Sequence, residues 1–339
     1  MKNSDCYVVV GTGSIAKRHI SNLKQLFPNA LIACAPSSKE SMSIHQIEAD
    51  KIFRDISEAI KANPICAIVA SPTPLHLKNA YDFLCSDIPT LIEKPLCQNL
   101  KAFKEYKEVF ERKKSIVEIG YCLRYQPAAI EFKKLIEKKN VLGEIHSVIV
   151  DVGQYLPDWR PGTDYKESVS AKESLGGGVL LELSHELDYI NWLFGASDSV
   201  FCKAINTGVL SIDVEDKVDA ILMRNDNFTI NLHMDFLQRN PERYCKVIGS
   251  EGNLQWDILR NRIVFKGSKE REEVLFFEEE YDRNEMYLSM LSRFSRLVKE
   301  NLKPLISLEE GLNVVNLIES MKKSSINNKV CGVDSLISQ

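Results

Sequence analysis

The sequence predicts an α/β protein of two domains: an N-terminal doubly wound domain over residues 1–122, and a C-terminal α+β domain with a large, mostly antiparallel sheet over residues 123–339. A strand, a glycine-rich turn and an amphipathic helix open the chain, and strands then alternate with helices up to about residue 121. Strand-like runs separated by short turns fill residues 200–279. A chain of 339 residues, 44% of them hydrophobic, is too long for one ordinary core.

The opening turn has the spacing of a dinucleotide site. Residues 7–10 are apolar and too few for a helix, and Gly11, Gly13 and Ala16 follow at the G-x-G-x-x-G/A spacing. Gly11 permits a tight turn, Gly13 lets the backbone approach a diphosphate, and the N–H groups of the next helix face that anion. We therefore expect NAD or NADP to bind at Gly11, Thr12, Gly13, Ser14, Ile15 and Ala16.

The rest of the first domain alternates between short apolar runs and helical stretches. The expected strands are residues 7–10, 31–34, 67–70, 91–93 and 116–120. The expected helices are residues 15–26, 56–61, 76–85 and 100–113. Strands separated by helices require crossover connections and therefore a parallel sheet, whose ligands bind beyond the carboxyl ends of the strands.

The loop after the second strand bears on the choice of cofactor. An NAD-selective protein usually places an acidic residue about 20 positions after the glycines. This chain has Ser37, Ser38 and Lys39 there, and hydroxyls with a cation suit a 2′-phosphate. These residues favour NADP over NAD, and a polar surface turn without a role in the cofactor is the alternative.

Two further loops follow strands of the same sheet. Ser71, Pro72, Thr73 and His76 follow residues 67–70 and are expected cofactor contacts, although His76 also fits an ordinary first-turn residue of a helix.

Glu93, Lys94 and Pro95 follow the next strand, and Glu93 and Lys94 are expected cofactor contacts. Desolvation and the charge of an oxidised nicotinamide would lower the pKa of Lys94 and suit it to acid/base work. The alternative is a surface lysine paired with Glu93.

Five separated motifs give a resemblance. Residues 11–16 (GTGSIA), 71–76 (SPTPLH), 92–95 (IEKP), 120–125 (GYCLRY) and 175–188 (LGGGVLLELSHELD) resemble, in this order, the glucose-fructose oxidoreductase/inositol dehydrogenase family (Gfo/Idh/MocA). The resemblance implies a Rossmann domain and an NAD(P)-dependent oxidoreductase acting on a secondary alcohol or ketone of a sugar, sugar nucleotide or cyclic polyol. It assigns substrate binding and proton transfer to Lys94 and His185. It also implies a homo-oligomer, a dimer or tetramer, through the sheet of the second domain.

The chain departs from the family pattern beside His185. Family members commonly place an aspartate four residues before the histidine, whereas this chain has Leu181 there and Glu182 three residues before His185. One residue corresponds to about 100° of helix rotation. Either the helix begins differently, or Glu182 and His185 meet as i, i+3 neighbours. Asp188 stands where the family keeps an acid and could orient the imidazole.

The second domain supplies the remaining expected substrate contacts. Residues 155–174 form a long polar loop with embedded aromatic residues, which we expect to cover the substrate; an oligomer contact is the alternative. The expected contacts are Arg124, Tyr125, Trp159, Arg160, Tyr165, Glu182 and Asp188. The other expected elements are helices at 126–138, 179–194, 285–300 and 308–322, and a strand at 143–154.

Composition excludes several classes of function. The net charge of -4 provides no basic field for nucleic acid or an anionic membrane, so a small molecule is the expected partner. No apolar run reaches the length of about 18 residues that a membrane span needs, and we expect a cytoplasmic protein. Nine cysteines stand singly, and six histidines show no metal-ligand spacing, so we expect reduced thiols and no metal.

Two other functions fit the same motifs. A glycosidase on this scaffold would keep its NAD bound, oxidise the sugar transiently and eliminate the aglycone, so product would form without lasting reduction of the cofactor. A non-catalytic NAD(P)-binding sensor would bind the cofactor and turn nothing over.

Overall fold

The computed structural model of the chain describes residues 5–38, 47–112, 116–225, 228–267 and 272–334. It divides into two compact units, which comprise residues 1–122 with 284–315, and residues 123–283 with 316–339. The domain boundary predicted from the sequence assigns residues 284–315 to the second domain. In the structure this segment belongs to the first unit because α10 (Glu285–Glu300) packs along α1 (Ser14–Leu26). Within the described residues, no helix is long and apolar enough to cross a membrane.

The first unit contains a six-stranded sheet in the order β3-β2-β1-β4-β5-β6. All five strand pairs are parallel. The strands are β1 (Cys6–Val10), β2 (Leu31–Ala35), β3 (Lys51–Ile52), β4 (Cys66–Val69), β5 (Thr90–Ile92) and β6 (Val117–Ile119). This is the strand order of the doubly wound dinucleotide-binding fold, so the predicted fold class is confirmed.

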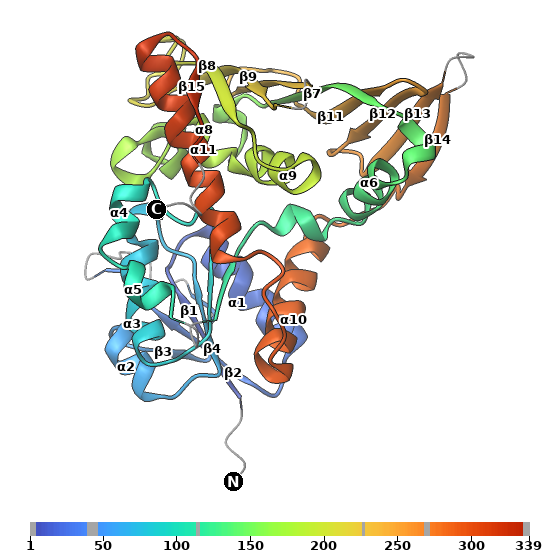
Figure 1. Cartoon of the computed structure of the whole chain (residues 1–339). Helices are drawn as coiled ribbons and strands as arrows, with labels where there is room; N and C mark the ends of the chain where they lie inside the picture. The colour runs from blue at the N-terminus through green and yellow to red at the C-terminus, as the bar shows by residue number, and fades with distance from the viewer. Residues whose placement is uncertain (1–4, 39–46, 113–115, 226–227, 268–271, 335–339) are drawn as a thin grey trace. The chain divides into compact units, whose positions relative to one another are not determined.

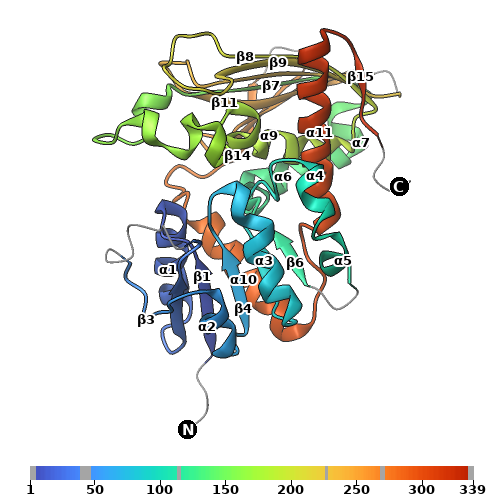
Figure 2. The same cartoon turned by 90° about the vertical axis from the view of Figure 1, so that its left-hand side faces the viewer.

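Helices cover both faces of this sheet. Figure 1 shows α1 and α10 on one side, and α2 (Ile56–Lys61), α3 (His76–Cys85) and α5 (Lys107–Phe110) on the other. Figure 2, turned by 90°, shows α3 in front of β4, against which it packs. The predicted helix at 100–113 is wrong as one element, because α4 (Leu100–Lys104) ends before Tyr106, the N-cap of α5.

The second unit contains a nine-stranded sheet in the order β14-β13-β12-β11-β7-β10-β9-β8-β15. Its strands are β7 (Ile145–Gly153), β8 (Ser199–Ile205), β9 (Lys217–Met223), β10 (Thr229–Asp235), β11 (Glu242–Gly249), β12 (Gly252–Asp257), β13 (Arg262–Gly267), β14 (Glu272–Phe277) and β15 (Cys331–Gly332). Among the described strands of this sheet, only β7 and β10 pair in parallel. The prediction of a mostly antiparallel sheet is confirmed.

Helices cover one face of this sheet. Alternation along the strands buries one set of side chains, as in β9, where Ala220 is buried and Ile221 is exposed. On the buried face, Trp256 of β12 contacts both Phe132 and Tyr189. The helices of this unit are α6 (Pro127–Glu137), α7 (Lys139–Leu142), α8 (Val179–Glu182) and α9 (Ser184–Phe194). The long helix α11 (Leu308–Asn327) runs on past residue 322, where the sequence predicted its end.

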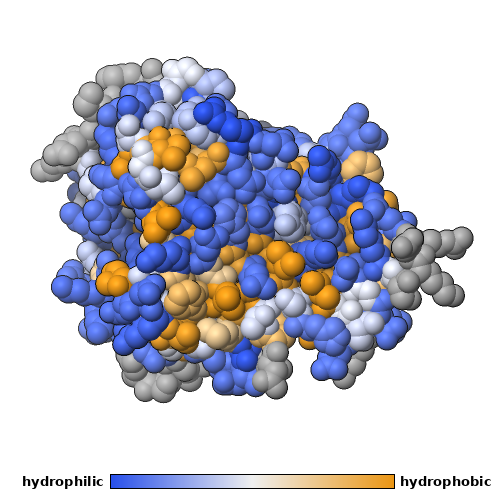
Figure 3. Space-filling model, turned by 90° about the horizontal axis from the view of Figure 1, so that it is seen from above, coloured by the Kyte–Doolittle hydropathy of each residue, from blue (hydrophilic) through white to orange (hydrophobic). Residues whose placement is uncertain are grey.

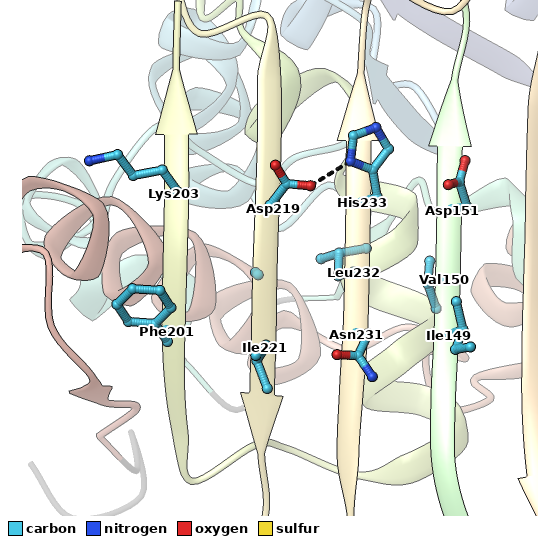
Figure 4. Close-up of a pocket in the computed structure, with 11 residues that line it drawn as sticks. Ile149, Val150, Asp151, Phe201, Lys203, Asp219, Ile221, Asn231, Leu232 and His233 are labelled. Atoms are coloured by element: carbon cyan, nitrogen blue, oxygen red, sulfur yellow. Dashed lines mark hydrogen bonds and ion pairs between the residues drawn. The ribbon is translucent and has the colours of Figure 1, made fainter.

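The other face of the sheet carries a hollow of about 330 Å³ over β7 to β10. Figure 4 shows Phe201 and Ile221 beside a row of polar side chains that includes Asp219 and His233. The imidazole of His233 lies 2.6 Å from Asp219 Oδ1 and 2.7 Å from Asp235 Oδ2. The hydrogen bond to Asp235, together with Asp219, raises the pKa of His233 to about 9. Figure 3, the view from above, shows hydrophobic residues gathered among hydrophilic ones.

Candidate active site

Gly11 stands at the carboxyl end of β1 for a structural reason. Its φ is +127°, and a Cβ there would lie 2.5 Å from the carbonyl oxygen of Ala70. Its N–H donates to the carbonyl oxygen of Ala35 over 2.9 Å, which ties the end of β1 to the end of β2. The backbone of the protein itself therefore requires glycine at this position.

Gly13 has a different reason. Its φ is -76°, which any residue adopts, and a Cβ there would meet no described atom within 4 Å. It is the N-cap of α1, whose first turn contains no capping side chain and no acidic residue. The N–H groups of that turn have no acceptor within the helix, and the positive end of the dipole favours an anion. Open space beside such N–H groups fits the diphosphate of a dinucleotide.

The end of β2 offers hydroxyl groups. Ala35 is the last residue of the strand, and the half-buried Ser37 and the exposed Ser38 follow it. Lys39, the predicted cation of this loop, lies outside the described residues. In this fold, the ribose of the cofactor reaches the end of the second strand, and here it would meet serine rather than a carboxylate.

The end of β4 contains buried polar residues. Ser71 and Thr73 are buried, and Thr73 begins the short 3-10 helix η2 (Thr73–Leu75). The hydroxyl of Ser71 has no hydrogen-bond partner within the described residues. A buried hydroxyl left in this way destabilises a protein, so a ligand that bonds it would compensate. The cofactor contacts assigned to Ser71, Pro72 and Thr73 stay predictions.

His76 corrects one expected cofactor contact. It is the first residue of α3 and is 1% exposed. Its Nδ1 lies 2.8 Å from the carbonyl oxygen of Pro95, and its Nε2 lies 2.8 Å from that of Ser71. Burial lowers the pKa of His76, although both carbonyl contacts act in the opposite direction. The ring is occupied inside the protein, so the alternative of a first-turn helix residue is the one that the structure supports.

Glu93 and Lys94 follow β5, and His19 of α1 reaches them. His19 Nε2 lies 2.7 Å from Glu93 Oε1, and Glu93 Oε2 accepts the backbone N–H of Lys94 over 3.2 Å. Although burial raises the pKa of Glu93, the hydrogen bond and the charge of His19 hold it below its ordinary value. The contact of His19 with Glu93 was not predicted from the sequence. The helical spacing of His19 with Ala16 and Leu23 could have indicated that it is buried, because all three lie on the buried face of α1.

His185 lies beside a break in the helix predicted over 179–194. α8 ends at Glu182, Leu183 has φ -94° and ψ 26°, and α9 begins at Ser184. The structure therefore supports the expectation that the helix begins differently, and a meeting of Glu182 and His185 as i, i+3 neighbours stays a prediction. The Glu182 carboxylate accepts a hydrogen bond from the hydroxyl of Ser170 over 3.1 Å.

The glycines before α8 are required by close backbone contacts at Gly177 and by a φ of +100° at Gly178. A Cβ at Gly177 would lie 2.5 Å from the carbonyl oxygen of Val169, and one at Gly178 would lie 2.6 Å from the carboxylate of Glu215. Glu215 accepts the N–H of Leu180 over 3.1 Å and so caps the start of α8. The run of glycines therefore lets the loop at 155–174 pack directly against the turn that leads to His185.

That loop is ordered as four short 3-10 turns, namely η4 (Leu156–Asp158), η5 (Tyr165–Glu167), η6 (Val169–Ala171) and η7 (Glu173–Leu175). Trp159, Arg160 and Tyr165 line one small hollow together with Ser170. The indole N–H of Trp159 donates to the carbonyl oxygen of Gln154, and its ring meets Phe236 edge to face. The structure thus brings together three of the predicted substrate contacts.

A buried ion pair and a partly buried one hold α9. Arg124 donates to Asp188 through Nε at 2.9 Å and Nη2 at 2.7 Å, and the two residues are 4% and 0% exposed. Arg243 of β11 pairs with Glu186, which is also buried, at 2.7 Å. Arg124 and Asp188 form an ion pair with each other, so the structure does not support the expectation that they contact the substrate. No local pattern could have revealed the pair of Arg243 and Glu186. The remaining predicted contact, Tyr125, is half-buried in η3 (Cys122–Tyr125).

Two family models cover most of the chain. A model described as "Oxidoreductase family, NAD-binding Rossmann fold" matches residues 6–121, and one described as "GFO/IDH/MocA C-terminal domain" matches residues 130–255. The chain belongs to the Gfo/Idh/MocA oxidoreductase family. Its first unit is accordingly an NAD-binding Rossmann domain. NAD fits the features described above, namely the open space at Gly13, the first turn of α1 and the hydroxyl of Ser71.

Similar proteins include dehydrogenases of polyols and sugars. Inositol 2-dehydrogenase of Rubrobacter xylanophilus is 24% identical over 204 residues, which are 59% of this chain and 55% of that protein. The chain thus spans little more than half of that relative. The scyllo-inositol 2-dehydrogenase (NAD(+)) of Bacillus subtilis is 24% identical over 334 residues, 91% of this chain and 92% of that protein.

A solved structure shares the fold. Levoglucosan dehydrogenase in complex with NADH and L-sorbose has a TM-score of 0.83 at 18% identity, with 98% of this chain and 100% of that chain covered. In the described residues of the chain itself, no group of three or more His, Cys, Asp or Glu side chains could hold a metal ion. The expectation of no metal stays a prediction.

Proposed function

We propose that this protein is an NAD(P)-dependent dehydrogenase or reductase that transfers a hydride between the nicotinamide and a CH–OH carbon of a sugar, sugar nucleotide or cyclic polyol. The observation that carries the proposal is the match of two models of one oxidoreductase family to the two parts of the chain. Relatives named as inositol dehydrogenases and a structural neighbour holding a sugar support the substrate class.

Lys94 and His185 would carry the proton chemistry. Oxidation of a secondary alcohol breaks a C–H bond and an O–H bond, and the proton must leave as the carbonyl forms. The bound nicotinamide would supply hydride transfer. The imidazole of His185 is suited to take the hydroxyl proton near neutral pH, and the ammonium of Lys94 to hold the substrate oxygen and share in that transfer.

The cofactor that we propose is NADP(H) in preference to NAD(H). The loop after β2 offers Ser37 and Ser38, and the sequence adds Lys39, whereas an NAD-selective site would place a carboxylate there. Titration of the protein with each cofactor tests this preference. A lower dissociation constant for NADPH supports the proposal, and tighter binding of NADH contradicts it.

Incubation with a panel of polyols and sugars tests the activity. Inositols, hexoses and sugar nucleotides, each supplied with NAD or NADP, should include at least one substrate that leaves the cofactor reduced, seen as lasting near-ultraviolet absorbance. Product without lasting reduction would indicate the cofactor-retaining glycosidase. Cofactor binding without any product would indicate the sensor.

We further propose that the protein forms a homo-oligomer, a dimer or tetramer, through the outer face of the nine-stranded sheet. Phe201, Ile205 and Ile221 are partly exposed there, and such an apolar patch is typical of a contact between proteins. Sedimentation of an Ile221→Asp variant tests the contact. A shift towards the monomer supports the proposal, and an unchanged sedimentation coefficient contradicts it.

A cytoplasmic location is also a proposal. All nine cysteines lie in the described residues and carry free thiols, which suits a reducing compartment. Cell fractionation tests this location.

A further inference from the structure

The short segment that carries Lys94 is fixed on both sides by histidines. On one side, His19 Nε2 lies 2.7 Å from the Glu93 carboxylate, whose other oxygen accepts the N–H of Lys94. On the other side, His76 Nδ1 lies 2.8 Å from the carbonyl oxygen of Pro95. Both rings are almost completely buried, at 0% and 1% exposure. The backbone around Lys94 is therefore held from two different helices, α1 and α3.

His76 also joins two loops of the sheet. Its Nε2 lies 2.8 Å from the carbonyl oxygen of Ser71, in the loop after β4, while Pro95 belongs to the loop after β5. A neutral imidazole carries one N–H and can donate to only one of these oxygens at a time. Substitutions can distinguish which carbonyl oxygen depends on that N–H, because asparagine and glutamine place their amide nitrogens differently.

We propose that His76 is a positioning residue for the reaction. Its Nδ1–H, donated to the carbonyl oxygen of Pro95, fixes the main chain immediately after Lys94 and thereby the place of the Lys94 ammonium. Loss of the bond would leave a buried carbonyl without a donor and let the segment move. A displacement of about 1 Å at a reacting group can cost about 100-fold in rate. This inference rests on the proposed function, because Lys94 is its catalytic group.

Two variants at one position separate this role from simple packing. The amide nitrogen of asparagine lies where Nδ1 of histidine lies, and that of glutamine lies where Nε2 lies. His76→Asn keeps the donor to Pro95 and should retain most of the wild-type kcat. His76→Gln keeps only the donor to Ser71 and should lower kcat by about 10-fold to 100-fold. Its Kd for the cofactor should stay the same, and the pH profile of kcat should shift.

A second measurement does not depend on turnover. Lysines labelled by reductive methylation with carbon-13 keep their charge, and the Lys94 signal can be assigned by its absence in Lys94→Arg. The chemical shift and titration midpoint of that signal should change in His76→Gln and match wild type in His76→Asn. If the wild type oxidises no polyol, the proposed function fails, and this titration still decides the role of His76.

When both variants fold, three outcomes would overturn the inference. They are equal behaviour of His76→Gln and wild type, equal loss in both variants, and a loss confined to the Kd of the cofactor. Circular dichroism checks that each variant is folded. If His76→Gln does not fold, His76→Asn decides alone: a wild-type titration of Lys94 supports the inference, and an altered one overturns it.

Discussion

The candidate functional regions of the two units are built in different ways. In the first unit, the groups suited to a dinucleotide are mainly backbone N–H groups and small residues, as at Gly13 and the first turn of α1. In the second unit, α9 depends on ion pairs whose partners stand 64 and 57 residues apart. Changes at Gly13 and the first turn of α1 should therefore act mainly on cofactor binding, and changes in α9 mainly on catalysis or stability.

The largest effect should come from His185 in the second unit. His185→Ala should lower kcat by about 100-fold to 10,000-fold, because general acid/base catalysis contributes about that much. The Kd of the cofactor should change little, because the proposed cofactor contacts lie in the first unit. Steady-state kinetics and fluorescence titration measure the two quantities. The exposed His146 offers a matched control, and a wild-type kcat for His185→Ala would end the role proposed for it.

The next effect should be on stability. Asp188→Ala removes the carboxylate that pairs with the buried guanidinium of Arg124, and such a loss costs about 3 to 5 kcal/mol of the free energy of unfolding. Urea unfolding measures it. Asp158→Ala, at an exposed position, should change it by less than about 0.5 kcal/mol. Equal effects of the two variants would mean that the buried pair does not hold α9.

Variants of Gly11 and Gly13 should separate an effect on stability from an effect on cofactor binding. Gly11→Ala should cost about 1 to 3 kcal/mol of the free energy of unfolding, because its φ is positive and its Cβ would meet the Ala70 carbonyl. Gly13→Ala should cost less than about 1 kcal/mol. It should nevertheless raise the Kd of the cofactor about tenfold, by filling the space proposed for the diphosphate. Calorimetric titration with unchanged affinity for Gly13→Ala would contradict the proposed cradle.

The smallest effect should be a difference in pH response. In the second unit the raised pKa of His233 means that its ion pairs stabilise the fold fully below about pH 6.5 and lose this contribution as the pH rises through about 9. In the first unit the lowered pKa of Glu93 means that its contribution is present above its ordinary pKa and is lost on acidification. Urea unfolding as the pH rises from about 6.5 through about 9 should show a decline in the free energy of unfolding of wild type that His233→Gln lacks. Equal slopes of this free energy against pH in the two proteins would mean that other groups cause the decline.

Elements with local signals could be predicted from the sequence. The helix predicted at 285–300 is α10 with the same bounds, because apolar residues such as Leu291 and Phe294 recur with helical spacing. The glycine-rich turn could also be predicted, since its spacing lies within consecutive residues. The expected roles of Gly11 and Gly13 then depend on what surrounds each Cα, which only the structure shows.

Features made by distant partners could not be predicted. The break at Leu183 has no glycine or proline to mark it, and α8 is capped by Glu215, 35 residues from Leu180. The ring of His76 could be assigned to the cofactor because nothing in the sequence tells which loop meets it. In the structure, the two nitrogens of that ring lie beside the carbonyl oxygens of Ser71 and Pro95 instead.

One measurement tests the central claim most directly: turnover of polyols by wild type and by Lys94→Ala, followed by the near-ultraviolet absorbance of reduced nicotinamide, with the Kd of the cofactor measured in parallel. The account predicts lasting reduction by wild type with at least one polyol. It also predicts a loss of about 100-fold to 10,000-fold in Lys94→Ala at a similar Kd. Wild-type turnover by Lys94→Ala would contradict it.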